Sequence, residues 1–277
     1  MSNMPEKLPQ NVEREIFLFA KEMSFYPKLL GRKIFDIIEE ECVVVFYPIM
    51  DAEEKNDGFF LPSMPLQNGE CKNIIYINTF QTEEKQVFIA AHEFGHYLKV
   101  SDIVNKKCCT AIDSERIVNR FAAEILMPTD LFKEYFVDTL KKNMGKTKAR
   151  VGLNMMIRCI VSSMDHFRVP YNSVVIRLVE TGLIRREDGI KLVDGFEQLS
   201  LEDISNIVDR CIVDGDYGAL RTSSHKKDIR GLKALLDEAE KRGNVSDVKL
   251  ERLRKEFGIV ATDDNVLEEE IRIAEGE

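Results

Sequence analysis

The spacing of apolar residues predicts the secondary structure of the first part of the chain. Residues 11–41 carry apolar positions at threes and fours, interrupted near Tyr26-Pro27 and Gly31, which predicts two amphipathic helices. β-Branched and aromatic runs separated by polar turns follow and predict a small three-stranded sheet over residues 43–47, 58–61 and 73–78. The last of these strands is equally well interpreted as an exposed edge strand, to which a peptide substrate could add, or as an interior strand.

After the sheet the helical period returns. Thr82 is a candidate N-cap and is followed by two glutamates, which suit the positive end of a helix dipole. Apolar residues recur at threes and fours up to Leu98, which predicts a helix of about five turns. A second helix is predicted over residues 113–126, ending before Pro128 because proline disfavours helical geometry in the preceding residue.

The sequence beyond Pro128 is helical in pattern almost throughout. Helices are predicted over residues 148–165, 171–181, 200–212, 228–242 and 247–257, and the acidic tail from Asp263 is predicted to be frayed or a contact surface. A basic cluster around Gly145 marks a boundary; it consists of Lys141, Lys142, Lys146, Lys148 and Arg150. We therefore predict an α+β fold in three parts: a domain with the sheet at 1–140, a helical segment at 141–185, and a helical C-terminal extension at 186–277.

Composition and charge then exclude several function classes. The net charge of −9 argues against a protein whose main role is unspecific contact with phosphates. The N-terminal residues are charged and proline-containing where a secretion signal needs an apolar run, and no stretch approaches the about 20 apolar residues of a membrane span. We therefore expect a cytoplasmic protein with no membrane partner, whose six cysteines are reduced.

The chemistry of the chain is concentrated in residues 92–96, His-Glu-Phe-Gly-His. Residues four apart on a helix lie one above the other, so His92 and His96 point to the same side and can hold one zinc ion. Glu93, one position further round, can reach a zinc-bound water and act as general base. The alternative interpretation is a pair of core histidines held by hydrogen bonds.

A third protein ligand is needed, because a catalytic zinc usually has three protein ligands and one open position. Glu115 lies near the start of the next predicted helix, and the intervening loop is long enough for that helix to return antiparallel to the first. Asn119, one turn later on the same face, can accept the other ring N–H of a ligating histidine. Glu124 is the rival ligand, but it lies about 180° round the helix from Glu115, so the two cannot both face the metal. We favour Glu115 because Asn119, Ala122 and Leu126 continue its face, and we interpret Glu124 as a solvated or ion-paired surface residue.

Two linked motifs give the chain a family resemblance. Residues 86–98 (QVFIAAHEFGHYL) and 115–128 (ERIVNRFAAEILMP) resemble the ImmA/IrrE family of zinc metallopeptidases. The family commonly has alanine where Val118 stands. The similarity extends through residues 167–171 (FRVPY) and 175–184 (VIRLVETGLI), where the family has a helix-turn-helix-like segment, usually with serine near Pro170. Residues 190–277 are not accounted for by the resemblance.

The resemblance implies a gluzincin-like metallopeptidase domain. In that domain His92, His96 and Glu115 bind Zn²⁺ and Glu93 acts on the zinc-bound water. Family members typically cleave a repressor or a similar regulatory protein, so the implied activity is that of a zinc-dependent endopeptidase with a protein substrate. The sequence does not identify the residue that stabilises the oxyanion; the available side chains are His166, His225, Tyr76 and Tyr97.

The predicted helix-turn-helix-like segment leaves a second function open. Its second helix offers only Arg177 as a long cation and also carries Glu180, so DNA binding is possible but not favoured over helix packing or docking of a protein. The alternative function is a regulatory or antitoxin-like binding protein with a structural or vestigial zinc site. Glu93 favours the enzyme, because hydrolysis requires a base whereas a structural site requires only ligands.

Overall fold

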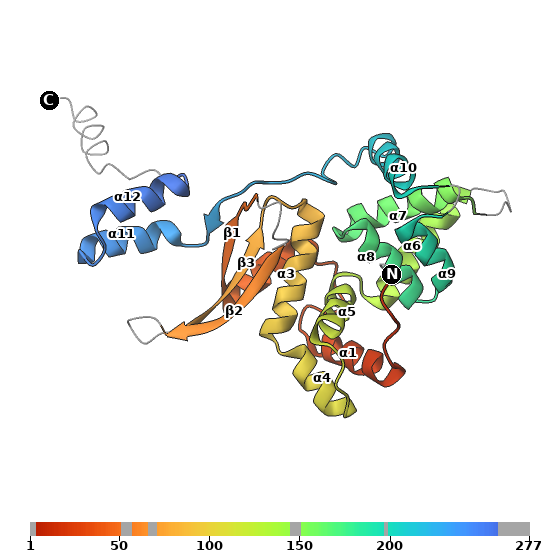
Figure 1. Cartoon of the computed structure of the whole chain (residues 1–277), viewed down its shortest axis with the longest axis horizontal. Coiled ribbons are helices and arrows are strands. Elements are labelled where there is room, and N and C mark those ends of the chain that lie inside the picture. Colours follow the sequence, from red (N-terminus) through yellow and green to blue (C-terminus); the bar gives the residue numbers. More distant parts are fainter. Residues whose placement is uncertain (1–3, 51–56, 66–70, 145–150, 197–198, 260–277) are drawn as a thin grey trace. The chain divides into compact units, whose positions relative to one another are not determined.

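The computed structural model describes residues 4–50, 57–65, 71–144, 151–196 and 199–259. Over these residues the chain is a mixed α+β protein, with twelve helices and four strands (Figure 1). It divides into two compact units, unit 1 (Met1–Lys226) and unit 2 (Lys227–Glu277). The three-part division predicted from the sequence stays a prediction. None of the described helices is long and apolar enough to cross a membrane.

The N-terminal part of unit 1 follows the predicted order of elements. Helices α1 (Gln10–Glu22) and α2 (Lys33–Glu41) precede strands β1 (Cys42–Tyr47), β2 (Gly58–Pro65) and β3 (Cys71–Asn78). Strand β3 lies between the other two, parallel to β1 and antiparallel to β2. Of the two interpretations of residues 73–78, the edge strand is therefore wrong and the interior strand is correct.

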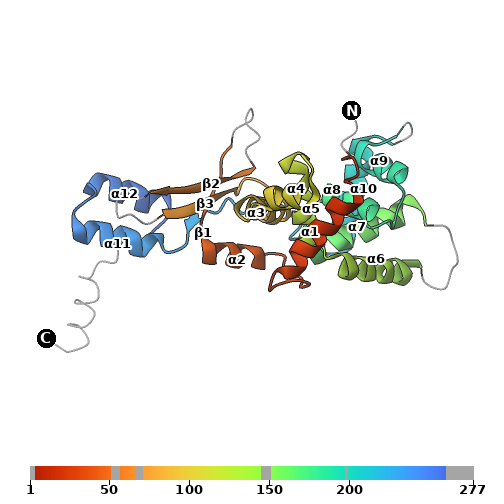
Figure 2. The ribbon, with the colours of Figure 1, turned by 90° about the horizontal axis from the view of Figure 1, so that it is seen from below.

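Alternation along β1 shows which face of this sheet packs against the helices. Val44 and Phe46 of β1 are buried, and so are Ile75 and Ile77, their partners in register on β3. Helix α2 packs on β1, and α3 (Glu83–Tyr97) packs on β2 and β3 (Figures 1 and 2). Burial of this apolar face holds α3 firmly against the sheet, and α3 is the helix that carries both histidines of the motif.

Seven further helices complete unit 1. They are α4 (Val100–Cys108), α5 (Ser114–Leu126), α6 (Thr129–Met144), α7 (Leu153–Phe167), α8 (Tyr171–Glu180), α9 (Arg186–Asp194) and α10 (Leu201–Asp214). Helices α6–α10 gather away from the sheet, on the other side of α3 and α5 (Figures 1 and 2). Helix α4 has no counterpart among the predicted elements; it is set off by Lys99 and Cys109, both in the left-handed backbone region.

Two sequence predictions in the second half need separate comment. The helix predicted from residue 148 begins at Leu153, and three members of the basic cluster (Lys146, Lys148 and Arg150) lie outside the described residues. The helix predicted from residue 228 begins only at Leu232, because Asp228–Ile229 form the short strand β4 and Gly231 has a left-handed conformation. That part of the prediction is wrong.

Unit 2 contains a helical hairpin. Helices α11 (Leu232–Arg242) and α12 (Asp247–Glu256) pack on each other, and Arg254 pairs with Asp237 at 2.8 Å and with Glu240 at 2.7 Å. The acidic tail from Asp263 lies outside the described residues, so the prediction for it stays open.

Candidate metal centre

The N-terminus of α3 is held by a distant part of the chain. Thr82 occupies the N-cap position as predicted, but its side chain makes no capping hydrogen bond. Instead the Glu83 N–H donates to the carbonyl of Thr222 at 2.8 Å, and the buried Glu84 carboxylate accepts the backbone N–H of Arg221 at 3.1 Å. Residues about 140 positions away therefore satisfy the start of this helix, which no local sequence signal indicates.

Glycine within the histidine motif allows the next helix to approach. A Cβ atom at Gly95 would lie 2.8 Å from Cγ1 of Val118 and 3.1 Å from Cδ1 of Phe121, both on α5. No side chain larger than hydrogen fits at this crossing without displacing α5. The close contact between α3 and α5 brings Glu115, at the start of α5, within reach of the histidines.

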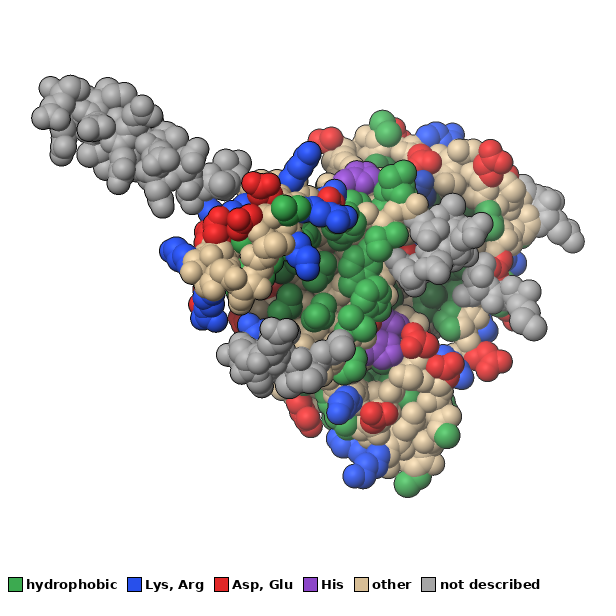
Figure 3. Space-filling model, turned by 60° about the vertical axis from the view of Figure 1, so that its left-hand side comes forward, with side chains coloured by type: hydrophobic (Ala, Val, Ile, Leu, Met, Phe, Trp, Pro, Cys, Tyr) green, Lys and Arg blue, Asp and Glu red, His purple; other side chains and the backbone are tan. Residues whose placement is uncertain are grey.

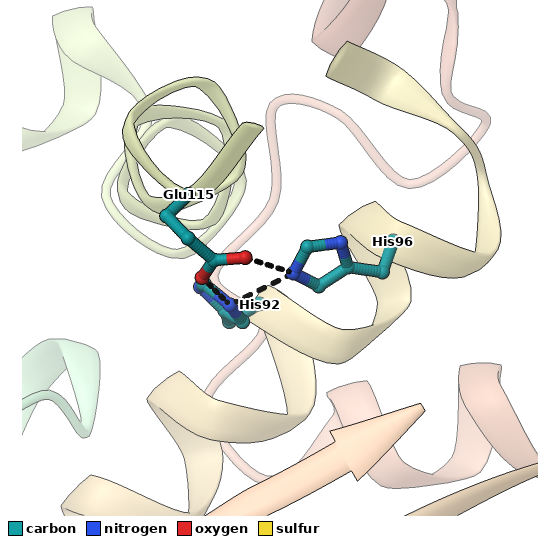
Figure 4. A group of neighbouring side chains, drawn as sticks. All are labelled: His92, His96 and Glu115. Atoms are coloured by element: carbon teal, nitrogen blue, oxygen red, sulfur yellow. Dashed lines mark hydrogen bonds and ion pairs between the residues drawn. The ribbon is translucent and has the colours of Figure 1, made fainter. Parts of the chain in front are cut away.

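Three side chains from these two helices converge on one point (Figure 4). Nε2 of His92 lies 3.1 Å from Oε2 of Glu115, and Nε2 of His96 lies 3.2 Å from Oε1 of the same carboxylate. The two Nε2 atoms are 3.1 Å apart. The Asp113 side chain accepts the backbone N–H of Glu115 at 2.9 Å and so fixes where α5 begins.

These separations fit a tetrahedral zinc ion. Zinc binds imidazole nitrogen and carboxylate oxygen at about 2.0–2.1 Å, so two ligands of one tetrahedron lie about 3.3–3.4 Å apart. The observed donor distances of 3.1–3.2 Å are close to that value. Two imidazoles and one carboxylate are also a donor set that suits zinc, and it leaves a fourth position open.

Asn119 completes the surroundings of His92. Its Oδ1 lies 3.0 Å from Nδ1 of His92, so the amide oxygen accepts the Nδ1 proton and leaves Nε2 free to bind a metal. Burial lowers the pKa of His92, and the neighbouring His96 lowers it further. The imidazole is therefore kept in the neutral form that coordinates a cation.

Glu93 is the second carboxylate of the site. Its side chain is 7% exposed and lines the same cleft as His92 and Glu115. Burial raises the pKa of Glu93 to about 7, the Glu115 charge contributes in the same direction, and a hydrogen bond from the Phe60 backbone opposes it. A carboxyl group with such a pKa exchanges protons near neutral pH.

The rival ligand Glu124 is not a surface residue, and our interpretation of its surroundings was wrong. It is fully buried, and it pairs with Arg177 at 2.7 Å and with Arg120 at 3.0 Å. Tyr26 and Thr129 also donate hydrogen bonds to its carboxylate. The sequence indicated an ion pair, but not its burial. The burial depends on α6 and α8, two helices that follow Pro128 in the sequence.

The cleft beside the three converging side chains has a volume of about 770 Å³. Its floor follows α3 from Lys85 to Glu93, and its opposite side is formed by the start of α8, the end of α9 and one face of α10. Tyr171 lines it with a buried hydroxyl group that has no hydrogen-bond partner among the described residues. The four side chains considered for oxyanion stabilisation, His166, His225, Tyr76 and Tyr97, do not line the described cleft.

The two helices of the predicted helix-turn-helix-like segment are present as α7 and α8, which pack on each other and are joined through Arg168 in a left-handed conformation. Arg177, the one long cation of α8, is completely buried and donates to the carbonyl of Met127. This cation holds the helices together and is not available to a phosphate at the surface.

Comparison with known proteins found one family. Residues 39–179, just over half of the chain, match the model of the IrrE N-terminal-like domain, a peptidase family. The matched range contains every residue of the candidate metal centre, from His92 to Asn119, and it ends at the end of α8. A search of curated proteins found no match.

Proposed function

The chain belongs to the ImmA/IrrE family of metallopeptidases, and from this premise we propose that it is a zinc-dependent endopeptidase that cleaves a repressor or another regulatory protein. The observation that carries the proposal is the convergence of His92, His96 and Glu115 with Glu93 in one cleft. A structural zinc usually has four protein ligands, whereas three converge here. In a binding protein, the buried Glu93 carboxylate at the cleft would cost stability without serving a function.

Each side chain of the site has a distinct task in peptide hydrolysis. When bound by the two histidines and Glu115, zinc supplies a Lewis acid that polarises a carbonyl and lowers the pKa of water to about 7. The Glu93 carboxylate takes up a proton from the attacking water and passes it to the nitrogen of the departing amine. Asn119 holds the proton on Nδ1 of His92 throughout, so that the ring keeps one orientation.

Strand β2 suits an extended peptide near Glu93. Among the strands of unit 1, β2 pairs with β3 alone, along one of its two edges. The backbone of Phe60 on β2 donates a hydrogen bond to the Glu93 carboxylate. Phe59 and Leu61 on this strand are 39% and 42% exposed, and Figure 3 shows hydrophobic side chains gathered in a band on one face of the molecule. A substrate strand added to β2 would bring its backbone to the catalytic carboxylate.

The test is a comparison of Glu93→Gln with the wild-type protein. The substitution keeps the size of the side chain and the three metal ligands, but it removes the base, which costs about 10²-fold to 10⁴-fold in rate. Both proteins are produced in the source cells, and newly formed protein N-termini are identified by mass spectrometry. Glu134→Gln, an exposed glutamate on α6, is the matched control.

We expect a small set of new N-termini, in a regulatory protein, with the wild type and with Glu134→Gln only. Zinc content should be equal in the three proteins. If Glu93→Gln produces the same N-termini as the wild type, the catalytic role of Glu93 is wrong. If the wild type produces no new N-termini, the peptidase proposal is wrong and the binding-protein alternative takes its place.

A further inference from the structure

Part of one side of the active-site cleft is built by residues that lie beyond the family match. Leu192 and Val193 at the end of α9 line the cleft, as does one face of α10. The family match ends at residue 179, so this part of the cleft lies outside the matched domain. All of these residues belong to unit 1.

The cleft-lining residues of α10 form a single stripe. Leu201, Ile204, Ser205 and Val208 follow the spacing of one helix face, and we call them the α10 wall. Ile204 and Val208 are buried at its base, whereas Leu201 is 51% exposed. Phe88 and Ile89 of α3 lie across the cleft from this wall. The α10 wall is therefore apolar apart from Ser205, as are Phe88 and Ile89 across the cleft, and Leu201 is left partly uncovered.

Arg221 fixes the position of the α10 wall along α3. Its backbone N–H bonds to Glu84 in the first turn of α3, and its guanidinium donates to the Ser205 hydroxyl at 3.3 Å. His92 lies eight residues after Glu84, so it is about 12 Å further along the helix. An extended peptide covers that distance in about three to four residues.

The charged groups at this end of the cleft are already paired. Arg221 forms an ion pair with Asp209, and Lys85 pairs with Asp57 at 2.8 Å. Neither pair leaves an uncompensated charge for a substrate side chain. The cleft therefore offers apolar surface, and the most exposed apolar side chain that α10 contributes to it is Leu201, which gains most from being covered by a substrate.

We propose that the α10 wall is a substrate-selecting subsite, which takes an apolar side chain about three to four residues from the scissile bond of an extended peptide. This inference rests on the proposed peptidase function and adds the class of residue that the enzyme selects. The occupant is a substrate segment because the wall is continuous with the metal centre within one cleft.

The test selects peptides by binding, so the natural substrate need not be identified first. The full chain carrying Glu93→Gln and loaded with Zn²⁺ is immobilised and offered a displayed library of random peptides. The same selection is made with Leu201→Lys added and, as matched control, with Val213→Lys added. Val213 is 78% exposed on the same helix and does not line the cleft.

We expect enrichment of apolar residues at one peptide position with Glu93→Gln alone and with the Val213→Lys control. Leu201→Lys should reduce that preference about tenfold or more and favour aspartate or glutamate at the same position. If the two lysine variants select the same peptides, or if none of the proteins enriches any sequence, the subsite does not exist.

Cleavage of the enriched peptides by the protein with native Glu93 separates the two proposals. Cutting about three to four residues from the selected apolar position supports both proposals, and cutting at a different distance contradicts the placement of the subsite. Binding of the peptides without any cleavage leaves the selective site in place but overturns the proposed peptidase function.

Discussion

Helix α5 carries one glutamate near each end, and the two have opposite surroundings. The Glu115 side chain is 59% exposed and faces two imidazoles. The Glu124 side chain is completely buried between two arginines. Both carboxylates have nitrogen neighbours at about hydrogen-bond distance, so short contacts alone do not identify a metal ligand.

The difference lies in what the neighbours can do. Arg120 and Arg177 remain protonated and satisfy Glu124 permanently, so that this carboxylate ties α5 to α8. Burial alone would raise the pKa of Glu124, but the two arginines lower it to about 2. The two histidines, in contrast, can bind a metal ion together with Glu115, so its carboxylate is available to a cation. The exposed end of α5 therefore presents Glu115 as a metal ligand, whereas Glu124 at the buried end stabilises the fold.

Of the substitutions that test this difference between the two glutamates, Glu115→Gln should have the largest effect, and the effect is on metal binding. Glu115→Gln removes the anionic ligand. The affinity for zinc should therefore fall by more than it does when a ligand only loses its hydrogen-bond partner, which costs about 10-fold to 100-fold. Zinc content is measured by mass spectrometry after competition with a chelator. The metal-free variant should fold normally. If Glu115→Gln retains zinc and Glu124→Gln loses it, the assignment of the third ligand is wrong.

The next effect is on stability, and it concerns the other end of the helix. Glu124→Gln leaves Arg177 buried beside a neutral side chain, which should lower the free energy of unfolding by about 3–5 kcal/mol. Urea unfolding of the metal-free proteins measures this difference, with Glu134→Gln on the surface of α6 as control. A change below about 0.5 kcal/mol, the range for surface substitutions, would contradict a structural role.

The pH dependence sharpens the same contrast. The pKa of Glu124 is lowered from 4.5 to about 2, so its ionised form stabilises the fold fully above pH 4.5. That contribution is lost as the pH falls from 4.5 towards 2. The difference in unfolding free energy between wild type and Glu124→Gln should therefore shrink by about 3 kcal/mol over this interval. A difference that is constant down to pH 2 would show that Glu124 is not held ionised.

The smallest effect is expected at Asn119, one turn after Glu115. Asn119→Ala removes the acceptor for Nδ1 of His92, and affinity for zinc should fall by about 10-fold to 100-fold with all three ligands retained. Chelator competition measures it, and Asn143→Ala on the exposed side of α6 is the control. Equal affinities of Asn119→Ala and wild type would mean that this contact does not orient His92.

The sequence by itself determined the local features of this site. Helical spacing placed His92 and His96 on one face, and the same argument placed Asn119 one turn after Glu115. Strands β1, β2 and β3 were also predicted, because their β-branched runs and turn residues act over a few positions, whereas the two-residue strand β4, the fourth strand of the sheet, was not. These features follow from bond geometry within one element, and neighbouring elements do not alter them.

Only the tertiary structure decided how those elements meet. The interior position of β3, the burial of Glu124 and the attachment of Arg221 to the start of α3 each join residues far apart in the chain. The α10 wall of the cleft belongs to the same class, since nothing in its pattern shows which element it faces. Periodicity specifies an apolar face but not its partner, because hydrophobic burial is non-directional and the packing of the whole unit selects the neighbour.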